Sequence, residues 1–416
     1  MSTPPDWNRP LASLPSACDV LVVGAGPAGS ACARVLAQAG RNVVLVDAQA
    51  FPRDKVCGDG LVPDSHAALR HLGVHERVMR AARAADAARC VAPSGSAIDV
   101  PGELAVLPRR ELDAVLCAAA VESGARMVAP ARFIEPVRDS TGRTVGARFA
   151  HAGLTREIGC RWLVLATGAT PAATLAAGLC ERRTPSAMAL RTYVRHPGLA
   201  GAIPNPRFVW HRRMRGGYGW IFPAPGNVFN IGVGLLDSHA EVPEDSRDVR
   251  RQGRNLRALF DDFLKVDPLA AQLMGEGEAL GELKGAPLRC DLNGAQWLAP
   301  GVLVAGEAAG ATYAFTGEGI GKALETGIAA ADSLLTQHDD PAVLADYRAR
   351  LEALRPRFQM YRKAASFNRY PLLVSLVVWR ARHSRRTLAR LSDILEERRM
   401  PGSLLSWRGF KGMMLG

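Results

Sequence analysis

The sequence predicts an α/β fold in which a parallel sheet with flanking helices is interleaved with a mostly antiparallel sheet and followed by a helical C-terminal tail. Three observations support this. Glycine-rich segments stand near both ends of the chain, at 24–29 and 306–319, the first of them follows an apolar run, and 416 residues are too many for one core. A ligand that is bound by segments from both ends of a chain is expected to be a permanently bound cofactor.

The first glycine segment has the surroundings of a dinucleotide-binding turn. It lies between an apolar run at 20–23 and a stretch without helix breakers at 28–38. A second apolar run then ends on Asp47, which follows Gly24 by 47 − 24 = 23 residues, where a carboxylate can accept hydrogen bonds from an adenosine ribose. We therefore expect a Rossmann-type strand, turn and helix that bind FAD.

Each residue of this turn has its own task. Gly24 allows the tight turn, Gly26 lets the backbone approach the pyrophosphate, and Gly29 brings the helix against the strand. Pro27 and Ala28 belong to the same loop and are also expected to contact FAD, because the N-terminus of the following helix faces the phosphates.

Composition excludes several classes of protein. The eight cysteines are scattered and none forms a CxxC pair, so we predict neither a disulfide framework nor a metal site, and we expect a reducing cytoplasm. Residues 1–17 lack the basic start and apolar run of a signal peptide. The longest apolar run near the C-terminus, at 371–379, is too short to span a membrane.

Charge is concentrated at the C-terminus. Residues 341–416 carry sixteen Lys and Arg against five Asp and Glu, so 16 − 5 = +11 of the formal net charge of +12 lies there. Apolar residues recur every three or four positions, which predicts an amphipathic helix that Pro356 kinks or splits. They are Leu344, Tyr347, Leu351, Leu354, Phe358, Tyr361 and Ala365.

Two interpretations of this tail stay open. It is either a helix packed on the protein with a solvated basic face, or a peripheral contact with anionic lipid on the inner membrane face. Nucleic acid is not an expected partner, because no nucleic-acid-binding module accompanies the basic residues.

Four segments in a fixed order carry a family resemblance. Residues 51–60 read FPRDKVCGDG, 109–113 read RRELD, 217–223 read GYGWIFP, and 315–320 read FTGEGI. They resemble the PRxKxCGDG, RxxLD, YxWxFP and PFTGEGI motifs of the geranylgeranyl reductase family of flavoproteins, and the resemblance covers roughly residues 18–335. It implies a fold similar to that of p-hydroxybenzoate hydroxylase.

The resemblance also implies a set of site residues. The expected FAD contacts include Arg53, Lys55, Arg109 and Gly168. Cys57 is a candidate proton donor, although a buried cysteine more often packs as a small apolar residue. The side chains of Tyr218, Trp220 and Phe222 alternate as on one face of a strand and are expected to wall an apolar substrate pocket, with Tyr218 as a second candidate proton donor.

The second glycine segment should bind the flavin end of FAD. Glu307, where related flavoproteins usually have Asp, would face the ribityl hydroxyls. The turn at Gly317 and Gly319 should start a helix over Ile320–Thr336 whose positive end points at the pyrimidine ring. Thr167-Gly168-Ala169 replaces the Ala-Asp-Gly of aromatic hydroxylases. A reduced ferredoxin or a flavin reductase is therefore an alternative to NADPH as electron donor.

The expected organisation has three parts. FAD-binding segments are 18–85, 106–185 and 286–340, the substrate domain is 86–105 with 186–285, and the basic helical region is 341–416. The leading function is FAD-dependent reduction of carbon–carbon double bonds in a long apolar substrate, isoprenoid or polyene-like. The alternatives are a flavin monooxygenase or halogenase acting on an aromatic or pyrrolic group, and a membrane-associated flavin electron carrier.

Overall fold

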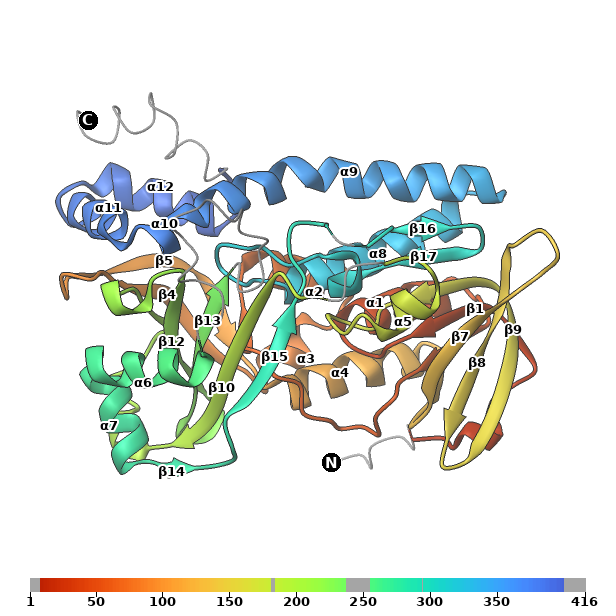
Figure 1. The fold of residues 1–416 in the computed structure, drawn as a ribbon, viewed down its shortest axis with the longest axis horizontal. Coiled ribbons are helices and arrows are strands. Elements are labelled where there is room, and N and C mark those ends of the chain that lie inside the picture. The colour runs from red at the N-terminus through yellow and green to blue at the C-terminus, as the bar shows by residue number, and fades with distance from the viewer. Residues whose placement is uncertain (1–7, 181–183, 237–254, 294, 400–416) are drawn as a thin grey trace.

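The protein consists of two sheets lying end to end, with helices around them and four C-terminal helices along one edge (Figure 1). A computed structural model describes residues 8–180, 184–236, 255–293 and 295–399. The first sheet lies to the right in Figure 1 and the second to the left.

The first sheet has the order β16-β17-β9-β1-β2-β6, and β7 and β8 continue from β9. Its strands are β1 (Ala17–Val23), β2 (Val43–Val46), β6 (Arg126–Val128), β7 (Arg132–Arg138), β8 (Thr144–His151), β9 (Leu154–Leu165), β16 (Leu298–Ala299) and β17 (Val302–Val304). The pairs β17–β9, β9–β1, β1–β2 and β2–β6 are parallel. This topology places β1, from near the start of the chain, and β17, from its last third, on either side of β9.

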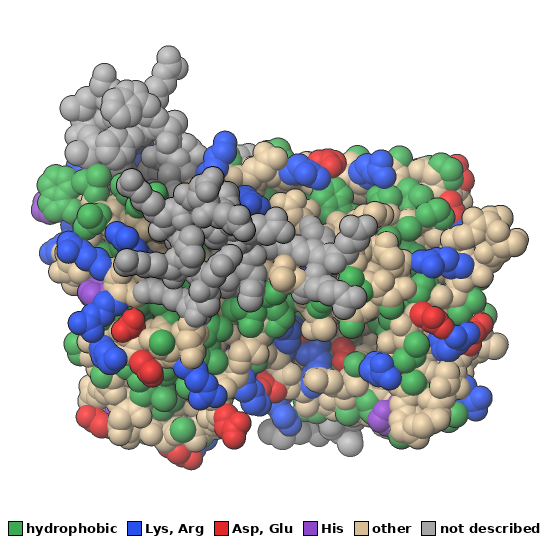
Figure 2. All heavy atoms as spheres, viewed as in Figure 1, with side chains coloured by type: hydrophobic (Ala, Val, Ile, Leu, Met, Phe, Trp, Pro, Cys, Tyr) green, Lys and Arg blue, Asp and Glu red, His purple; other side chains and the backbone are tan. Residues whose placement is uncertain are grey.

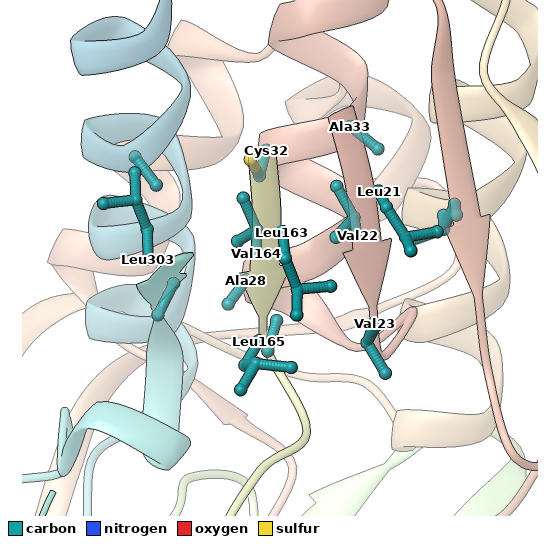
Figure 3. Packing of buried hydrophobic residues seen from close by; sticks show 14 of the residues in the cluster. Leu21, Val22, Val23, Ala28, Cys32, Ala33, Leu163, Val164, Leu165 and Leu303 are labelled. Atoms are coloured by element: carbon teal, nitrogen blue, oxygen red, sulfur yellow. The ribbon is translucent and has the colours of Figure 1, made fainter. Parts of the chain in front are cut away.

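Apolar strands explain the parallel part of this sheet. Every residue of β2 and β17 is buried, as expected where helices cover both faces. Figure 3 shows the side chains of β1, β9 and β17 packed with Ala28, Cys32 and Ala33 of α1 (Pro27–Gln38). The strand expected at 20–23 is confirmed as part of β1, the second apolar run forms β2, and α1 begins one residue before the stretch expected to be helical.

Helices pack closely around this sheet. α1 contacts α4 (Arg109–Glu122) and α8 (Ile320–Thr336), and α8 has the predicted bounds. A Cβ on Gly327 of α8 would lie 2.1 Å from the carbonyl oxygen of Ala28, so only glycine permits this approach. The remaining helices of this part are α2 (Pro63–His71), α3 (His75–Met79) and α5 (Ala172–Ala176).

The second sheet has the order β14-β10-β13-β12-β11-β4-β5-β3, with β15 also paired to β10. Its strands are β3 (Gly60–Leu61), β4 (Arg83–Val91), β5 (Ala97–Val106), β10 (Ala187–Arg195), β11 (Arg207–Val209), β12 (Gly217–Ala224), β13 (Val228–Leu236), β14 (Glu278–Ala279) and β15 (Lys284–Leu288). Among the described residues of this second sheet, β11 and β4 are the only strands that pair in parallel. α6 (Leu256–Val266) packs on this sheet through Phe260 and Phe263, and α7 (Pro268–Glu276) joins the same apolar cluster through Ala270 and Leu273.

Several residues that the sequence analysis assigns to FAD-binding segments lie in the second sheet. They are 83–85 in β4, 106 in β5, 286–288 in β15, and 60–61, which form β3. They belong there because β4 pairs with β5 from Arg83 onward and β15 pairs with β10 up to Leu288. The division into functional domains stays a prediction, and residues 237–254 of the predicted substrate domain lie outside the described residues.

The C-terminal helices are α9 (Asp340–Ala364), α10 (Ser366–Arg369), α11 (Pro371–His383) and α12 (Arg385–Leu395). The predicted apolar face of α9 packs on the protein. Its residues Tyr347, Leu351, Phe358 and Tyr361 are buried in the core of the first sheet. The expectation that Pro356 splits this helix is wrong. A proline removes one backbone donor, and buried side chains on both sides of it hold the helix together.

Residues 400–416 of the predicted tail lie outside the described part of the chain. Over the residues that the structure describes, we find no helix of sufficient length and hydrophobicity to cross a bilayer.

Candidate active site

The first glycine loop joins β1 to α1 under tight steric limits. Gly24 has a φ of +101°, and a Cβ there would lie 2.3 Å from the carbonyl oxygen of Ala166. A Cβ on Gly29 would lie 1.8 Å from the carbonyl oxygen of Gly24. The protein's own packing therefore requires glycine at both positions.

Gly26 differs from its neighbours because its own chain leaves room around it. A Cβ there would have as its nearest contacts the guanidinium groups of Arg53 and Arg109, each at 3.6 Å. Gly26 is also the N-cap of α1, where free N–H groups and the helix dipole attract anions. Two cations and a helix N-terminus thus converge above Gly26, which fits a pyrophosphate.

Two carboxylates orient these arginines. Asp113 is fully buried and accepts from Arg109 at 2.7 and 2.9 Å and from Arg53 at 2.9 Å. Asp47, after β2, accepts from the backbone N–H of Ala25 at 2.9 Å and lies 3.5 Å from Arg53. Burial beside Asp113 would lower the pKa of Arg109, but the carboxylate outweighs this and raises it. Both guanidinium groups are therefore held as fixed cations.

The turn after β9 borders the same loop. Gly168 has a φ of +75°, and a Cβ on it would meet no atom within 4 Å. The hydroxyl of Thr167 is buried and finds no hydrogen-bond partner among the described residues. An unsatisfied buried hydroxyl next to open space fits the edge of a cofactor site.

The second glycine segment packs on the first. A Cβ on Gly306 would lie 2.7 Å from the Cβ of Ala28 in α1. Glu307 Oε1 lies 3.4 Å from both the backbone nitrogen of Arg289 and the hydroxyl of Thr312. Gly317 has a φ of +72°, and Gly319 is the N-cap of α8 before Ile320. The middle of α8 therefore packs on the start of α1 at Ala28, and its N-terminus at Gly319 opens beside Thr312 of the second glycine segment.

Residues 53–60, which we term the Cys57 loop, connect the two sheets. From the second sheet, Arg191 of β10 donates to Asp54 Oδ1 at 2.6 Å and to the Lys55 carbonyl at 3.2 Å. The two glycines of the loop touch β12: a Cβ on Gly58 would lie 3.2 Å from the ring of Phe222, and one on Gly60 would lie 3.3 Å from it. The Cys57 loop thus packs against β12, the strand that carries Tyr218, Trp220 and Phe222, while its residue Arg53 reaches the first glycine loop.

Asp59 is the centre of a buried hydrogen-bond network. Its carboxylate accepts from the hydroxyl of Tyr193, from the amide of Asn230 at 2.7 Å and from the backbone N–H of Arg109 at 3.2 Å. Asn230 also donates to the Cys57 carbonyl at 2.7 Å and accepts from the indole of Trp220 at 2.9 Å. Burial raises the pKa of Asp59 to about 6, although these hydrogen bonds oppose the shift.

Cys57 and Lys55 are both half-buried. Burial raises the pKa of the Cys57 thiol, and the nearby Arg109 guanidinium offsets part of the effect. A neutral thiol is the form that a proton donor needs. Cys57 also packs against the apolar cluster that contains Leu61 and Leu112, as its structural interpretation expects.

Tyr218, Trp220 and Phe222 share one face of β12, and each is less than a tenth exposed. They form an aromatic cluster with Phe208 and Trp210. Val374 and Val378 of α11 pack on this cluster, so the C-terminal helices cover the predicted substrate wall.

Tyr218 also ties the aromatic cluster to the second glycine segment. Its hydroxyl donates to the Thr316 carbonyl, and burial raises its pKa, so the phenol stays protonated. A cavity of about 410 Å³ lies elsewhere, beside Trp297 and Arg348, and does not include these aromatics.

Comparisons with known proteins agree with this geometry. Residues 17–219 match the FAD binding domain family. The chain is 34% identical to menaquinone reductase of Mycolicibacterium smegmatis over 80% of its own length and 81% of the relative's. It is 30% identical to digeranylgeranylglycerophospholipid reductase 2 of Methanopyrus kandleri over 74% of each chain. The chain belongs to the geranylgeranyl reductase family of FAD-dependent oxidoreductases.

The predicted fold class and the FAD cofactor are thereby confirmed. A solved structure of a flavoprotein/dehydrogenase from Cytophaga hutchinsonii shares the fold with a TM-score of 0.74 at 18% identity, over 95% of this chain and 99% of that chain. The sites of individual residues remain predictions.

Sequence reasoning missed part of the site. Asp59 and Asp113 lie inside the quoted motifs, but their residue types alone do not reveal their partners. Arg191, Tyr193 and Asn230 lie in none of the quoted motifs. Their only signal is the register of β10 on β13, which sets Tyr193 opposite Asn230.

Proposed function

We propose that this flavoprotein reduces a carbon–carbon double bond in the isoprenoid chain of a quinone or polar lipid. The observation that carries the proposal is the Cys57 loop, which contacts the aromatic strand through Gly58 and sends Arg53 to the cofactor loop. The names of the two relatives support the substrate class, because menaquinone and digeranylgeranylglycerophospholipid both carry isoprenoid chains.

The protein's residues would divide this work. Arg53, Arg109 and the α1 N-terminus would hold the pyrophosphate, and Glu307 and the α8 N-terminus would face the flavin end. When bound and reduced, FAD supplies a hydride to one alkene carbon. The protein or water must then give a proton to the other carbon, and Cys57 and Tyr218 are the candidate donors.

Aromatic side chains suit an alkene substrate of this kind. The rings of Tyr218, Trp220 and Phe222 offer apolar area without charge, which excludes water from the reacting bond. Asp59 and Asn230 would fix the backbone on both sides of Cys57 through the hydrogen bonds described above. The substrate would therefore have to enter beside α11, which covers these rings.

The test is product analysis under anaerobic conditions. The dithionite-reduced protein is mixed with a polyprenyl quinone or a geranylgeranyl lipid, and the product should gain two hydrogens. Cys57→Ala should slow this step while Cys18→Ala, which changes a buried cysteine of β1, should not. A reaction that requires oxygen and adds a hydroxyl or halogen would contradict the proposal. The alternative monooxygenase and halogenase functions rest on the shared fold alone.

We propose that a ferredoxin or a flavin reductase, and not NADPH directly, reduces the flavin. The turn after β9 reads Thr167-Gly168-Ala169 and lacks the aspartate of hydroxylases that use NADPH directly. Stopped-flow mixing should show fast flavin bleaching with reduced ferredoxin or reduced free flavin. Equally fast bleaching by NADPH alone would contradict this choice of donor.

We also propose that α11 docks on anionic lipid. Its inner face packs on the aromatic cluster, whereas Leu372 and Trp379 are 60% and 52% exposed on its outer side. No Asp or Glu stands between Glu352 and Asp393, so all the charged residues that α10, α11 and the start of α12 contribute are basic. Figure 2 shows hydrophobic and basic side chains side by side at the end of the molecule where α11 and α12 lie.

This surface would bring a membrane-borne lipid next to the substrate wall. Each basic residue near an anionic membrane contributes about 1 kcal/mol, and exposed Leu and Trp insert at the interface. The protein should co-sediment with anionic vesicles at low salt, and the double variant Leu372→Glu, Trp379→Glu should not. Leu280→Glu, at an exposed leucine after β14, is the control. Equal sedimentation of all three proteins, or none, would contradict the docking surface without affecting the proposed reaction.

A further inference from the structure

A group of metal-ligating side chains lies outside the cofactor site. His66 of α2, His75 of α3 and Glu103 of β5 turn one ligand atom each toward a common point, and these atoms all lie within 4.8 Å of one another. The sequence analysis predicts no metal site, on the ground that the cysteines are scattered, and it does not consider these three residues. The fold brings them together.

We propose that His66, His75 and Glu103 bind one first-row divalent metal ion, of which Zn²⁺ is the best-suited. His66 Nδ1 lies 3.0 Å from His75 Nε2, and each of these nitrogens lies 3.7 Å from Glu103 Oε1. Tetrahedral zinc with ligand bonds near 2.1 Å sets its donors about 3.4 Å apart. The three separations bracket this value, so small rotations of the side chains complete the site.

The ligand types and their exposure fit zinc as well. Two imidazoles and one carboxylate are a common three-ligand set that leaves the fourth position to water. His66 is fully buried and His75 is 13% exposed, whereas Glu103 is 43% exposed, so the open position faces solvent. A shared N–H···N hydrogen bond would account for the contact between the histidines, but not for the approach of Glu103 to both.

One group competes with the metal. Arg70 of α2 donates to the same oxygen of Glu103, and this guanidinium would have to release it or move to the other carboxylate oxygen. Arg70 is 50% exposed, and an ion pair at such a surface contributes little. Arg70→Ala should therefore tighten metal binding.

The site would act as a clamp near the Cys57 loop. β5 pairs with β3, whose residues Gly60 and Leu61 directly follow Asp59, and α2 begins two residues later. A metal that joins α2 and α3 to β5 would fix the course of the chain after the loop. It would stabilise the junction of the two sheets and take no part in the chemistry.

The test uses the full-length, FAD-loaded protein after chelator treatment. Titration with Zn²⁺ should give one equivalent bound and a higher thermal midpoint, and Co²⁺ should give the absorption bands of a tetrahedral site. His75→Ala and Glu103→Gln, which change partly exposed residues, should each weaken Zn²⁺ binding by about 100-fold or more and abolish the thermal shift. His71→Ala, an exposed histidine on the same helix, is the matched control.

Two results would overturn the proposal. One is wild-type protein that binds no Zn²⁺ and shows no thermal shift. The other is a His75→Ala protein that retains its FAD and binds Zn²⁺ as tightly as the His71→Ala control.

Discussion

The Cys57 loop separates two regions that are built in different ways. On the cofactor side, a Cβ on Gly24 or Gly29 would lie 2.3 Å or less from a carbonyl oxygen, and the fully buried Asp113 holds both arginines. On the substrate side, aromatic rings pack with one another and with α11, a helix from the far end of the chain. The cofactor region is specified by local backbone geometry, whereas the substrate region depends on tertiary packing that substitutions can reshape.

The largest effects are expected in the glycine loop, and they should differ between two neighbouring glycines. Gly29→Ala should destabilise the protein by about 3 kcal/mol or more, because its Cβ would lie 1.8 Å from a carbonyl oxygen. Gly26→Val should leave the fold intact but abolish FAD binding, because its side chain enters the space between Arg53 and Arg109. Thermal unfolding and the ratio of flavin to protein measure both, with Gly201→Ala as control at a position with open space. Stable, fully loaded Gly26→Val protein would refute the pyrophosphate assignment.

A smaller effect is expected at Asp113. Asp113→Ala leaves the buried Arg109 guanidinium without its carboxylate and takes from Arg53 the nearer of its two carboxylates. The substitution should lower the free energy of unfolding by about 3 kcal/mol and also weaken FAD binding. Asp99→Ala, which removes an exposed partner of Arg89, should change stability by less than about 1 kcal/mol. Denaturant unfolding compares the two, and equal losses would mean that Asp113 does not organise the cofactor side.

The substrate side should tolerate change without losing FAD. Trp220→Phe leaves the side-chain oxygen of Asn230 without its indole donor. This should lower the free energy of unfolding by about 1–2 kcal/mol. Flavin content should remain stoichiometric, and anaerobic reoxidation by a prenyl lipid should slow. Loss of FAD in this variant would show that the two regions are not separable.

The smallest effect concerns the pH dependence of stability. Burial raises the pKa of Asp59 to about 6, above the ordinary value of 3.8, so the folded protein binds a proton more tightly than the unfolded chain. The contribution of Asp59 to the free energy of unfolding is therefore largest below about pH 4. It falls as the pH rises from about 4 to about 6 and is constant above that. Asp59→Asn should flatten this part of the curve of Tm against pH. An unchanged slope would mean that Asp59 titrates normally.

The same contrast explains what could be predicted from the sequence. The glycine turn, α1 and α8 follow from local signals, and α8 has its predicted bounds. The two side chains that donate to Asp59 come from β10 and β13, more than a hundred residues away, so only the strand register reveals them. The uninterrupted α9 and the covering of the aromatic wall by α11 depend likewise on tertiary packing, which outweighs the local signal of Pro356.

The central claim is that the Cys57 loop couples the cofactor side to the aromatic side. Gly58→Val tests it most directly, because a Cβ there would already lie 3.2 Å from the ring of Phe222 and 3.7 Å from the indole nitrogen of Trp220. We predict that this variant keeps one FAD per chain but is reoxidised by a prenyl lipid about 100-fold more slowly than the wild type, with Gly201→Val unaffected. Unchanged reoxidation, or loss of FAD from an otherwise folded protein, would contradict the account.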